Sequence, residues 1–252
     1  MAGRDEIIGF LDALLDCASF ADHGPNGLQV PGAAEVRTVA TGVSAHRELF
    51  ERAAAVGAEL VLCHHGLFWE GEPRAISPRL KGRLEALFER DMSLAAYHLP
   101  LDAHPEVGNN ALICAALGLA RAESFGSHRG RELGWVGRSD EGISPTVLLA
   151  RCRTAFGREP LTFPGTADPV RSVGIVSGGG ASSLAEAVDR GLDAFLTGEP
   201  AEPSMADAAE AGIHFVAGGH YGTETLGVRR LGDILAEHFG LAHRFIEVRN
   251  PV

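Results

Sequence analysis

Apolar and polar residues alternate at helical spacing near the start of the chain. In the segment DEIIGFLDALL, residues 5–15, apolar positions fall three and four apart, which predicts an amphipathic helix. Three short apolar runs follow, and the stretches between them have helical character. The pattern predicts strands at 36–43, 59–63 and 92–98, and helices at 45–57, 78–90 and 111–119.

The second half of the chain repeats this alternation. Ser144 followed by Pro145 is typical of a helix start, because Ser caps free backbone N–H groups and Pro suits the first helical position. Strands are predicted at 170–176, 193–198 and 213–219, and helices at 181–191 and in the Ala- and Glu-rich stretch before residue 213. Strands that alternate with helices of this length predict an α/β protein with a parallel or mixed sheet.

The two halves also resemble each other. With residue 37 placed on residue 171, a shift of 171 − 37 = 134, the strand–helix–strand pattern coincides and His65 falls on Glu199. We therefore predict two similar α/β halves, 1–124 and 125–252, with mixed sheets flanked by helices. The identities are few, so chance similarity between two βαβ units is the alternative.

Histidines stand at the ends of several predicted strands. His64 and His65 end the run LVLC, and since a regular strand aims successive side chains at opposite faces, both can share one target only at a strand-to-loop edge. Two more strand ends carry a histidine and, four residues later, a carboxylate: His98 with Asp102, and His220 with Glu224. Ligands of open α/β sheets gather outside the carboxyl ends of strands, so these side chains form a candidate site.

Imidazoles and carboxylates without thiolates suit Zn, Mn, Fe, Ni or Co. Five or six ligands exceed the needs of one tetrahedral ion and fit two ions that share a carboxylate. A single histidine at a strand end is usually structural, but the adjacent pair together with two His-x-x-x-carboxylate turns favours a metal site. Most of the remaining histidines are predicted to be structural or solvated, because they lack such neighbouring ligands; His104 is the most open of them, since it lies close to Asp102. They are His23, His46, His104, His128, His214, His238 and His243.

Two turn-rich segments are candidates for further sites. SGGGASS, residues 177–183, lies between a strand and a helix and could cradle a phosphate, but it has neither the Lys of a P-loop nor the GxGxxG spacing. A tight turn around Gly178–Gly180 is the preferred interpretation. In ADHGPNGLQV, residues 21–30, Pro25, Asn26 and Gly27 indicate a turn.

Composition narrows the classes of function. The formal net charge of −11 argues against broad binding to nucleic acid, which depends on Lys and Arg. No apolar stretch approaches the roughly 20 residues of a membrane helix, and the charged N-terminal residues do not resemble a signal peptide, so a cytoplasmic protein is expected. The four cysteines form no CxxC pair, which argues against a zinc finger or a disulfide framework, and Cys63 is predicted to be a buried core residue.

Six motifs together resemble one family. GPNGLQV, LCHHGLFW, AYHLPLDAHPEVGNNA, VSGGG, DAFLTGE and AGGHYGTE occur in the same order as in the YbgI-type (Nif-three-like) proteins, which are called GTP cyclohydrolase 1 type 2 homologues. The resemblance runs from about residue 20 to the final NPV. It implies a dinuclear metal centre between two α/β halves, in a ring-shaped homohexamer without the large inserted domain of some relatives.

The resemblance also assigns roles to residues. It implies metal ligands at His64, His65, Asp102, His220 and Glu224, with Glu224 bridging two divalent ions of unknown identity. His98 matches a histidine that lines the site and is expected to donate or accept a proton. The chain departs from many relatives at Tyr221, where they have a second histidine that is not a ligand.

The expected activity follows from the resemblance together with the predicted metal site. A metal-dependent hydrolase acting on a nucleotide or a related small molecule, GTP cyclohydrolase-like by resemblance, is the preferred function. Fold and metal site alone do not establish a substrate. The alternative is a non-enzymatic metal-handling or regulatory scaffold. Turnover of a nucleotide panel by metal-loaded protein separates the two.

Overall fold

The computed structural model describes all 252 residues and divides into two compact units. Unit 1 comprises Met1–Leu101 and Gly227–Arg249, and unit 2 comprises Asp102–Leu226 and Asn250–Val252. The chain leaves unit 1 within α4 (Leu99–Ala103) and returns to it within α10 (Thr225–Phe239). These units differ from the predicted halves 1–124 and 125–252, because the last helix and strand of the chain belong to the first unit.

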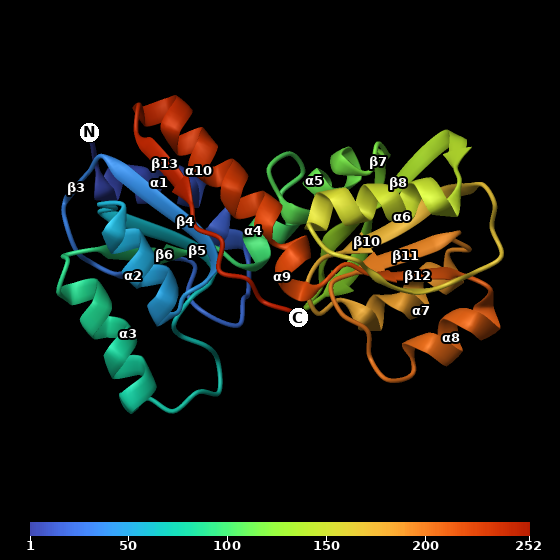
Figure 1. Ribbon diagram of the computed structural model, residues 1–252, viewed down its shortest axis with the longest axis horizontal. Coiled ribbons are helices and arrows are strands. Elements are labelled where there is room, and N and C mark those ends of the chain that lie inside the picture. The colour runs from blue at the N-terminus through green and yellow to red at the C-terminus, as the bar shows by residue number, and fades with distance from the viewer. The chain divides into compact units, whose positions relative to one another are not determined.

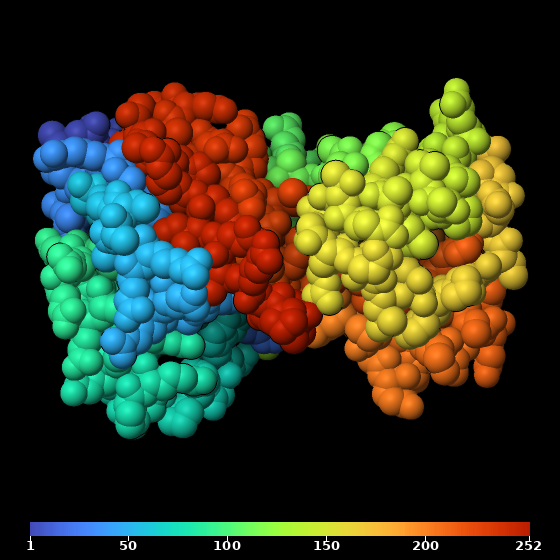
Figure 2. All heavy atoms as spheres, viewed as in Figure 1, coloured from blue at the N-terminus to red at the C-terminus, as the bar shows by residue number.

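Unit 1 is built on a five-stranded sheet with the order β13-β4-β5-β6-β2. Its strands are β13 (Ala242–Phe245), β4 (Thr38–Ser44), β5 (Leu60–His65), β6 (Ser93–Ala96) and β2 (Gly27–Val30). The first four are parallel and β2 is antiparallel. Residues 227–249, drawn in red, therefore lie beside the blue N-terminal part of the same unit (Figure 2).

Helices α2 (Arg47–Ala55) and α3 (Pro78–Phe88) lie side by side over one face of this sheet (Figure 1). Phe50 of α2 and Leu87 of α3 are fully buried against alternate strand residues such as Val61 and Leu94. Ser77 caps α3 through a bond from the Leu80 N–H (3.2 Å). The other elements of unit 1 are α1 (Arg4–Leu14), the 3-10 turn η1 (Cys17–Ser19), and β1 (Ala2–Gly3) paired with β3 (Glu35–Val36).

Unit 2 is built on a six-stranded sheet with the order β7-β8-β10-β11-β12-β9. Its strands are β7 (Ala120–His128), β8 (Arg131–Ile143), β10 (Val170–Val176), β11 (Ala194–Thr197), β12 (His214–Ala217) and β9 (Leu161–Phe163). The central strands β10, β11 and β12 are parallel, and the outer ones are antiparallel to their neighbours.

Both faces of this sheet are covered by helices (Figure 1). Leu196 of β11 packs with α5 (Asn109–Ala116) and α6 (Pro145–Phe156) on one face, while its neighbour Phe195 packs with α7 (Leu184–Asp189) and α8 (Ser204–Ala211) on the other. This alternation explains why β11 is buried throughout. The 3-10 turn η2 (Ala181–Ser183) precedes α7, and the short α9 (His220–Thr223) follows β12.

A hydrogen-bond pattern repeats at the predicted shift of 134. In unit 1 the Glu59 carboxylate accepts from the backbone N–H groups of residues 37 (3.1 Å) and 38 (2.9 Å). In unit 2 the Asp193 carboxylate accepts from those of residues 171 (2.8 Å) and 172 (2.9 Å). In each unit, a carboxylate that lies just before the second strand accepts hydrogen bonds from the backbone at the start of the first strand. This shared pattern supports a genuine repeat over chance similarity.

The expected fold class is confirmed: the chain is a mixed α/β protein with two helix-flanked sheets. The predicted strands of both halves are present as β4, β5, β6, β10, β11 and β12. None of the helices is both long and apolar enough to cross a membrane.

Candidate metal centre

Three histidines of unit 1 lie together at the carboxyl ends of adjacent parallel strands. His64 and His65 end β5, and His98 follows β6. The ring centroids are 4.7 Å apart for His64 and His65, 5.0 Å for His64 and His98, and 5.6 Å for His65 and His98. One ligand nitrogen of each ring lies within 4.8 Å of the others, so the three could share a metal ion.

The loop after the histidine pair depends on Gly66. A Cβ at this position would lie 2.2 Å from the side-chain nitrogen of Gln29. Gln29 Oε1 also accepts from the backbone N–H of Leu67 (2.8 Å). A side chain at residue 66 would therefore displace the contact that holds the loop beside β2.

The Nδ1 atoms of the three rings are held by the protein. His64 Nδ1 lies 2.9 Å from the Tyr97 carbonyl oxygen, which only accepts, so this nitrogen carries the proton and Nε2 has the lone pair. His98 Nδ1 lies 2.7 Å from Asp22 Oδ1, and His65 Nδ1 lies 3.1 Å from Ser44 Oγ. Metal-binding histidines usually bond a carbonyl or carboxylate in this way through the nitrogen that is not a ligand.

Asp22 has a buried side chain, and the sequence patterns did not single it out. Burial alone would raise the pKa of its carboxyl, but hydrogen bonds from His98, Asn26 and the backbone of His23 outweigh that effect and lower the pKa to about 2. Asp22 is therefore ionised at neutral pH. Asp22 lies in the segment ADHGPN, whose Pro and Asn residues indicate a turn or loop. The one sequence feature that pointed to Asp22 is its position just before the first family motif, GPNGLQV.

In unit 2 the predicted ligand Asp102 is buried and held by two side chains. Its Oδ1 accepts from Asn109 Nδ2 (2.8 Å) and from Ser177 Oγ (3.0 Å). These two uncharged donors hold the carboxylate in one position. A carboxylate in this state suits a cation.

The other two predicted ligands of unit 2 contact each other. His220 Nε2 lies 3.2 Å from Glu224 Oε1, and His220 Nδ1 lies 3.1 Å from Glu199 Oε1. The hydrogen bond with Glu224 raises the pKa of His220 to about 9 against the effect of burial, and Glu199 adds to the rise. Two carboxylates around one imidazole favour positive charge there, either a proton or a metal ion.

The glycine turn after β10 packs against this pair. A Cβ on Gly178 would lie 2.3 Å from Glu224 Oε1 and 3.1 Å from His220 Nε2. The Gly178 N–H donates to Thr223 Oγ1 (3.0 Å), so it is already used within the protein. These contacts favour the tight-turn interpretation over a phosphate cradle. Because the preceding residue Ser177 donates a hydrogen bond to Asp102, this segment lies against both predicted carboxylate ligands of unit 2, Asp102 and Glu224.

Four of the histidines predicted to be structural have structural bonds. His46 caps α2 by accepting from the Leu49 N–H, and His104 accepts from the Val107 N–H at 3.1 Å. His214 bonds two backbone groups after β9, and His243 lies between Thr41 and Asp233 side chains. The prediction for these four is confirmed.

The donor set fits a borderline or hard metal ion. Cys63, the cysteine nearest in sequence to the histidine pair, is fully buried in the core of unit 1, and burial raises the pKa of its thiol. The remaining candidate donors are imidazole nitrogens and carboxylate oxygens, several of them already oriented by bonds to neighbouring residues. Such ligands suit Zn, Mn, Fe, Ni or Co ions better than they suit soft metal ions, which prefer thiolate ligands.

Comparisons with known proteins agree with the resemblance drawn from the motifs. The family model described as Duf34/NIF3 (NGG1p interacting factor 3) matches residues 2–251. A Pseudomonas aeruginosa protein named "GTP cyclohydrolase 1 type 2 homolog" is 40% identical over 240 residues, covering 95% of each chain. The solved structure titled protein ybgI, of unknown function, has a TM-score of 0.93 and 36% identity, with both chains covered completely. The solved structure of TTHA1606 from Thermus thermophilus has a TM-score of 0.88 and 37% identity, also over both whole chains.

Proposed function

Since the chain belongs to the Duf34/NIF3 (NGG1p interacting factor 3) family, we propose that it is a metal-dependent hydrolase acting on a nucleotide or a related small molecule. One observation carries this proposal: three imidazoles at adjacent strand ends have ligand nitrogens within 4.8 Å of one another. The bond from His64 Nδ1 to a carbonyl and that between His98 Nδ1 and a carboxylate support a role for Nε2 toward a metal ion or substrate.

The proposed centre holds two divalent ions, of Zn, Mn, Fe, Ni or Co. The residues that would hold these ions are those that the family resemblance implies, with Glu224 as the proposed shared carboxylate: His64, His65, Asp102, His220 and Glu224. When bound, such ions activate a water molecule and neutralise charge on substrate oxygens.

The protein's own residues supply the rest of the chemistry. Asn109 and Ser177 keep Asp102 in one orientation, so this carboxylate needs no reorganisation on binding a cation. His98 takes a proton from the attacking water and returns it to the leaving group. The nucleotide class is supported by the name of the Pseudomonas aeruginosa relative, "GTP cyclohydrolase 1 type 2 homolog". We also propose a homohexamer, on the resemblance that the motifs carry, and a cytoplasmic location, as expected from the sequence.

The test begins with elemental analysis of protein purified without chelators. Close to two ions per chain are expected, and no more than one ion in every reconstitution would contradict the dinuclear centre. Protein loaded with each metal found is then assayed against a panel of purine and pyrimidine nucleotides. Full metal with no turnover of any compound would favour the non-enzymatic scaffold.

Three variants separate ligands from the proton-transfer residue. Glu224→Gln should weaken both ions, since a neutral amide replaces a shared charge. His98→Ala should keep its metal and lose about 10²–10⁴-fold in rate. His128→Ala, at an exposed histidine that ends β7, is the matched control and should change neither quantity. A His98→Ala variant that empties of metal would contradict the assigned roles.

A further inference from the structure

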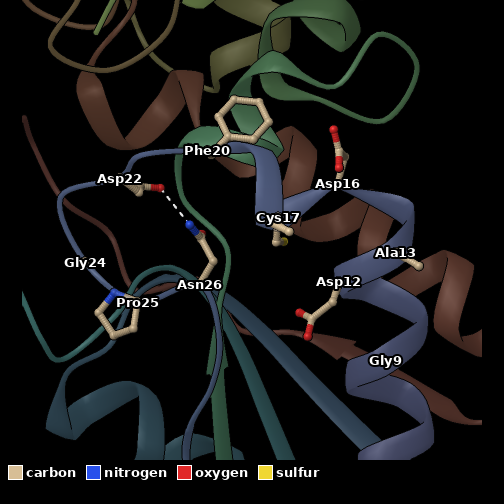
Figure 3. Close-up of a pocket in the computed structure, with 11 residues that line it drawn as sticks. Gly9, Asp12, Ala13, Asp16, Cys17, Phe20, Asp22, Gly24, Pro25 and Asn26 are labelled. Carbon is tan, nitrogen blue, oxygen red and sulfur yellow. Dashed lines mark hydrogen bonds between the residues drawn. The ribbon is translucent and has the colours of Figure 1, made fainter.

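Two side chains of the loop between η1 and β2 form hydrogen bonds with His98. Asp22 Oδ1 lies 2.7 Å from His98 Nδ1, and Asn26 Oδ1 accepts from the His98 backbone N–H (2.8 Å). Asn26 Nδ2 in turn donates to Asp22 Oδ2 (2.9 Å), the bond marked in Figure 3. Side chain and backbone of His98 are therefore fixed by one connected group.

Both oxygens of the Asp22 carboxylate face N–H donors. Oδ1 accepts from the His23 N–H (2.6 Å) besides its bond with His98, and Oδ2 accepts from the Leu99 N–H (2.9 Å) besides that of Asn26. The Asp22 side chain is only 2% exposed. An ionised carboxylate accepts hydrogen bonds and donates none, so His98 must carry its proton on Nδ1.

We propose that Asp22 is a positioning residue, which holds His98 in the Nδ1–H tautomer so that its Nε2 lone pair takes the proton of the attacking water. The proton moves from the water oxygen to Nε2, and the resulting imidazolium is stabilised by the adjacent carboxylate. This role rests on the proposed hydrolysis, but the tautomer itself does not. It also distinguishes His98 from His64, whose Nδ1 bonds a neutral carbonyl.

The substitution Asp22→Asn has a definite expected effect. The Oδ2 position faces two donors, from Leu99 and Asn26, so an amide nitrogen is disfavoured there. At the Oδ1 position the amide nitrogen faces one fixed donor, the His23 N–H, and the His98 ring, which can adapt by moving its proton to Nε2, so this orientation is the less disfavoured of the two. The variant should therefore switch the tautomer of His98 and leave an N–H where the lone pair was needed.

Asp12→Asn is the matched control. Asp12 lines the same pocket as Asp22 and Asn26 (Figure 3), but its Oδ1 accepts from the Tyr97 hydroxyl (2.8 Å). The substitution removes a carboxylate of the same kind beside the same turn. The His98 tautomer should not change.

The primary measurement is long-range ¹H–¹⁵N NMR of the imidazole nitrogens in metal-free protein, with the His98 signals assigned from a His98→Gln variant. The wild-type protein and Asp12→Asn should show His98 protonated on Nδ1, and Asp22→Asn should show it protonated on Nε2. A wild-type His98 protonated on Nε2 would overturn the proposal without any Asp22 variant, even if Asp22→Asn does not fold. An unchanged tautomer in Asp22→Asn would overturn it too.

Kinetics form the second measurement, made on metal-loaded protein with a substrate from the nucleotide panel. Asp22→Asn should keep its metal content and KM and lose about 10²–10⁴-fold in kcat. An unchanged kcat would overturn the positioning role. If no compound is turned over, the proposed hydrolysis fails while the NMR result still decides whether Asp22 sets the tautomer.

Discussion

Gly178→Ala tests whether the glycine turn exists to leave space for Glu224. Gly178 has φ +60°, a left-handed conformation that costs a residue with a Cβ about 1–2 kcal/mol. Alanine recovers about 0.4–1 kcal/mol through the lower entropy of its unfolded chain. The backbone effect alone should therefore lower the free energy of unfolding by about 1 kcal/mol.

The contact with Glu224 adds to this backbone effect. The new Cβ would lie 2.3 Å from Glu224 Oε1, whereas ordinary contact begins at 3.4 Å, so the two atoms must separate by 3.4 − 2.3 = 1.1 Å. Glu224 is buried, and its carboxylate would have to leave its present position. Since loss of a residue that merely orients a ligand costs about 10–100-fold in metal affinity, a displaced ligand should cost at least about 10-fold.

Gly191→Ala is the control for the backbone effect. Gly191 has φ +63°, and a Cβ there would have no atom within 4 Å. Urea unfolding of metal-free protein should show a lower free energy of unfolding for both variants, with Gly178→Ala destabilised at least as much as Gly191→Ala. Calorimetric titration with Mn²⁺ or Zn²⁺ should show weaker binding in Gly178→Ala alone. Equal metal affinities in the two variants would refute the reasoning.

Three further predictions concern acid stability, thiols and assembly. The folded-state pKa of Asp22 is lowered from 3.8 to about 2, so it contributes about 2 kcal/mol above pH 3.8 that is lost as the pH falls toward 2; urea unfolding of Asp22→Asn should lack this part of the acid dependence. The buried thiols of Cys63, Cys114 and Cys152 have raised pKa values, so Ellman's reagent should label none of these three until urea is added; since the fourth thiol, Cys17, is only partly buried, rapid labelling of more than one thiol per native chain would contradict their burial. Light scattering should give about six times the chain mass of 26.5 kDa, and a monomer at micromolar concentration would contradict the hexamer.

The sequence predicted those parts of the fold and site that depend on local patterns. Buried parallel strands have continuous apolar runs. The histidines at the end of β5 and just after β6 were expected together because adjacent parallel strands end at one edge. The hairpin of β7 and β8 was not predicted. Most side chains of β7 are exposed, so its sequence ARAESFGSH shows no apolar alternation.

Asp22 shows a second limit of local reasoning. Pro25 and Asn26 indicate a turn or loop, and a loop does join η1 to β2, but the proposed role of Asp22 depends on a hydrogen bond to a residue 76 positions away. Nothing in the spacing of ADHGPN indicates that partner. Burial of a carboxylate becomes visible only in the folded chain, where the donors that offset its desolvation are in place.

The discontinuous unit 1 has a consequence for the order of events during translation. Residues 102–226, nearly all of unit 2, leave the ribosome before α10 and β13, although unit 1 begins first. Until then β4 lacks the strand that pairs with it from Thr38 to Thr41, and its backbone groups on that side are exposed. The nascent first unit therefore waits with an open sheet edge while the second is synthesised, and this interval is when a chaperone would have an exposed edge strand to bind.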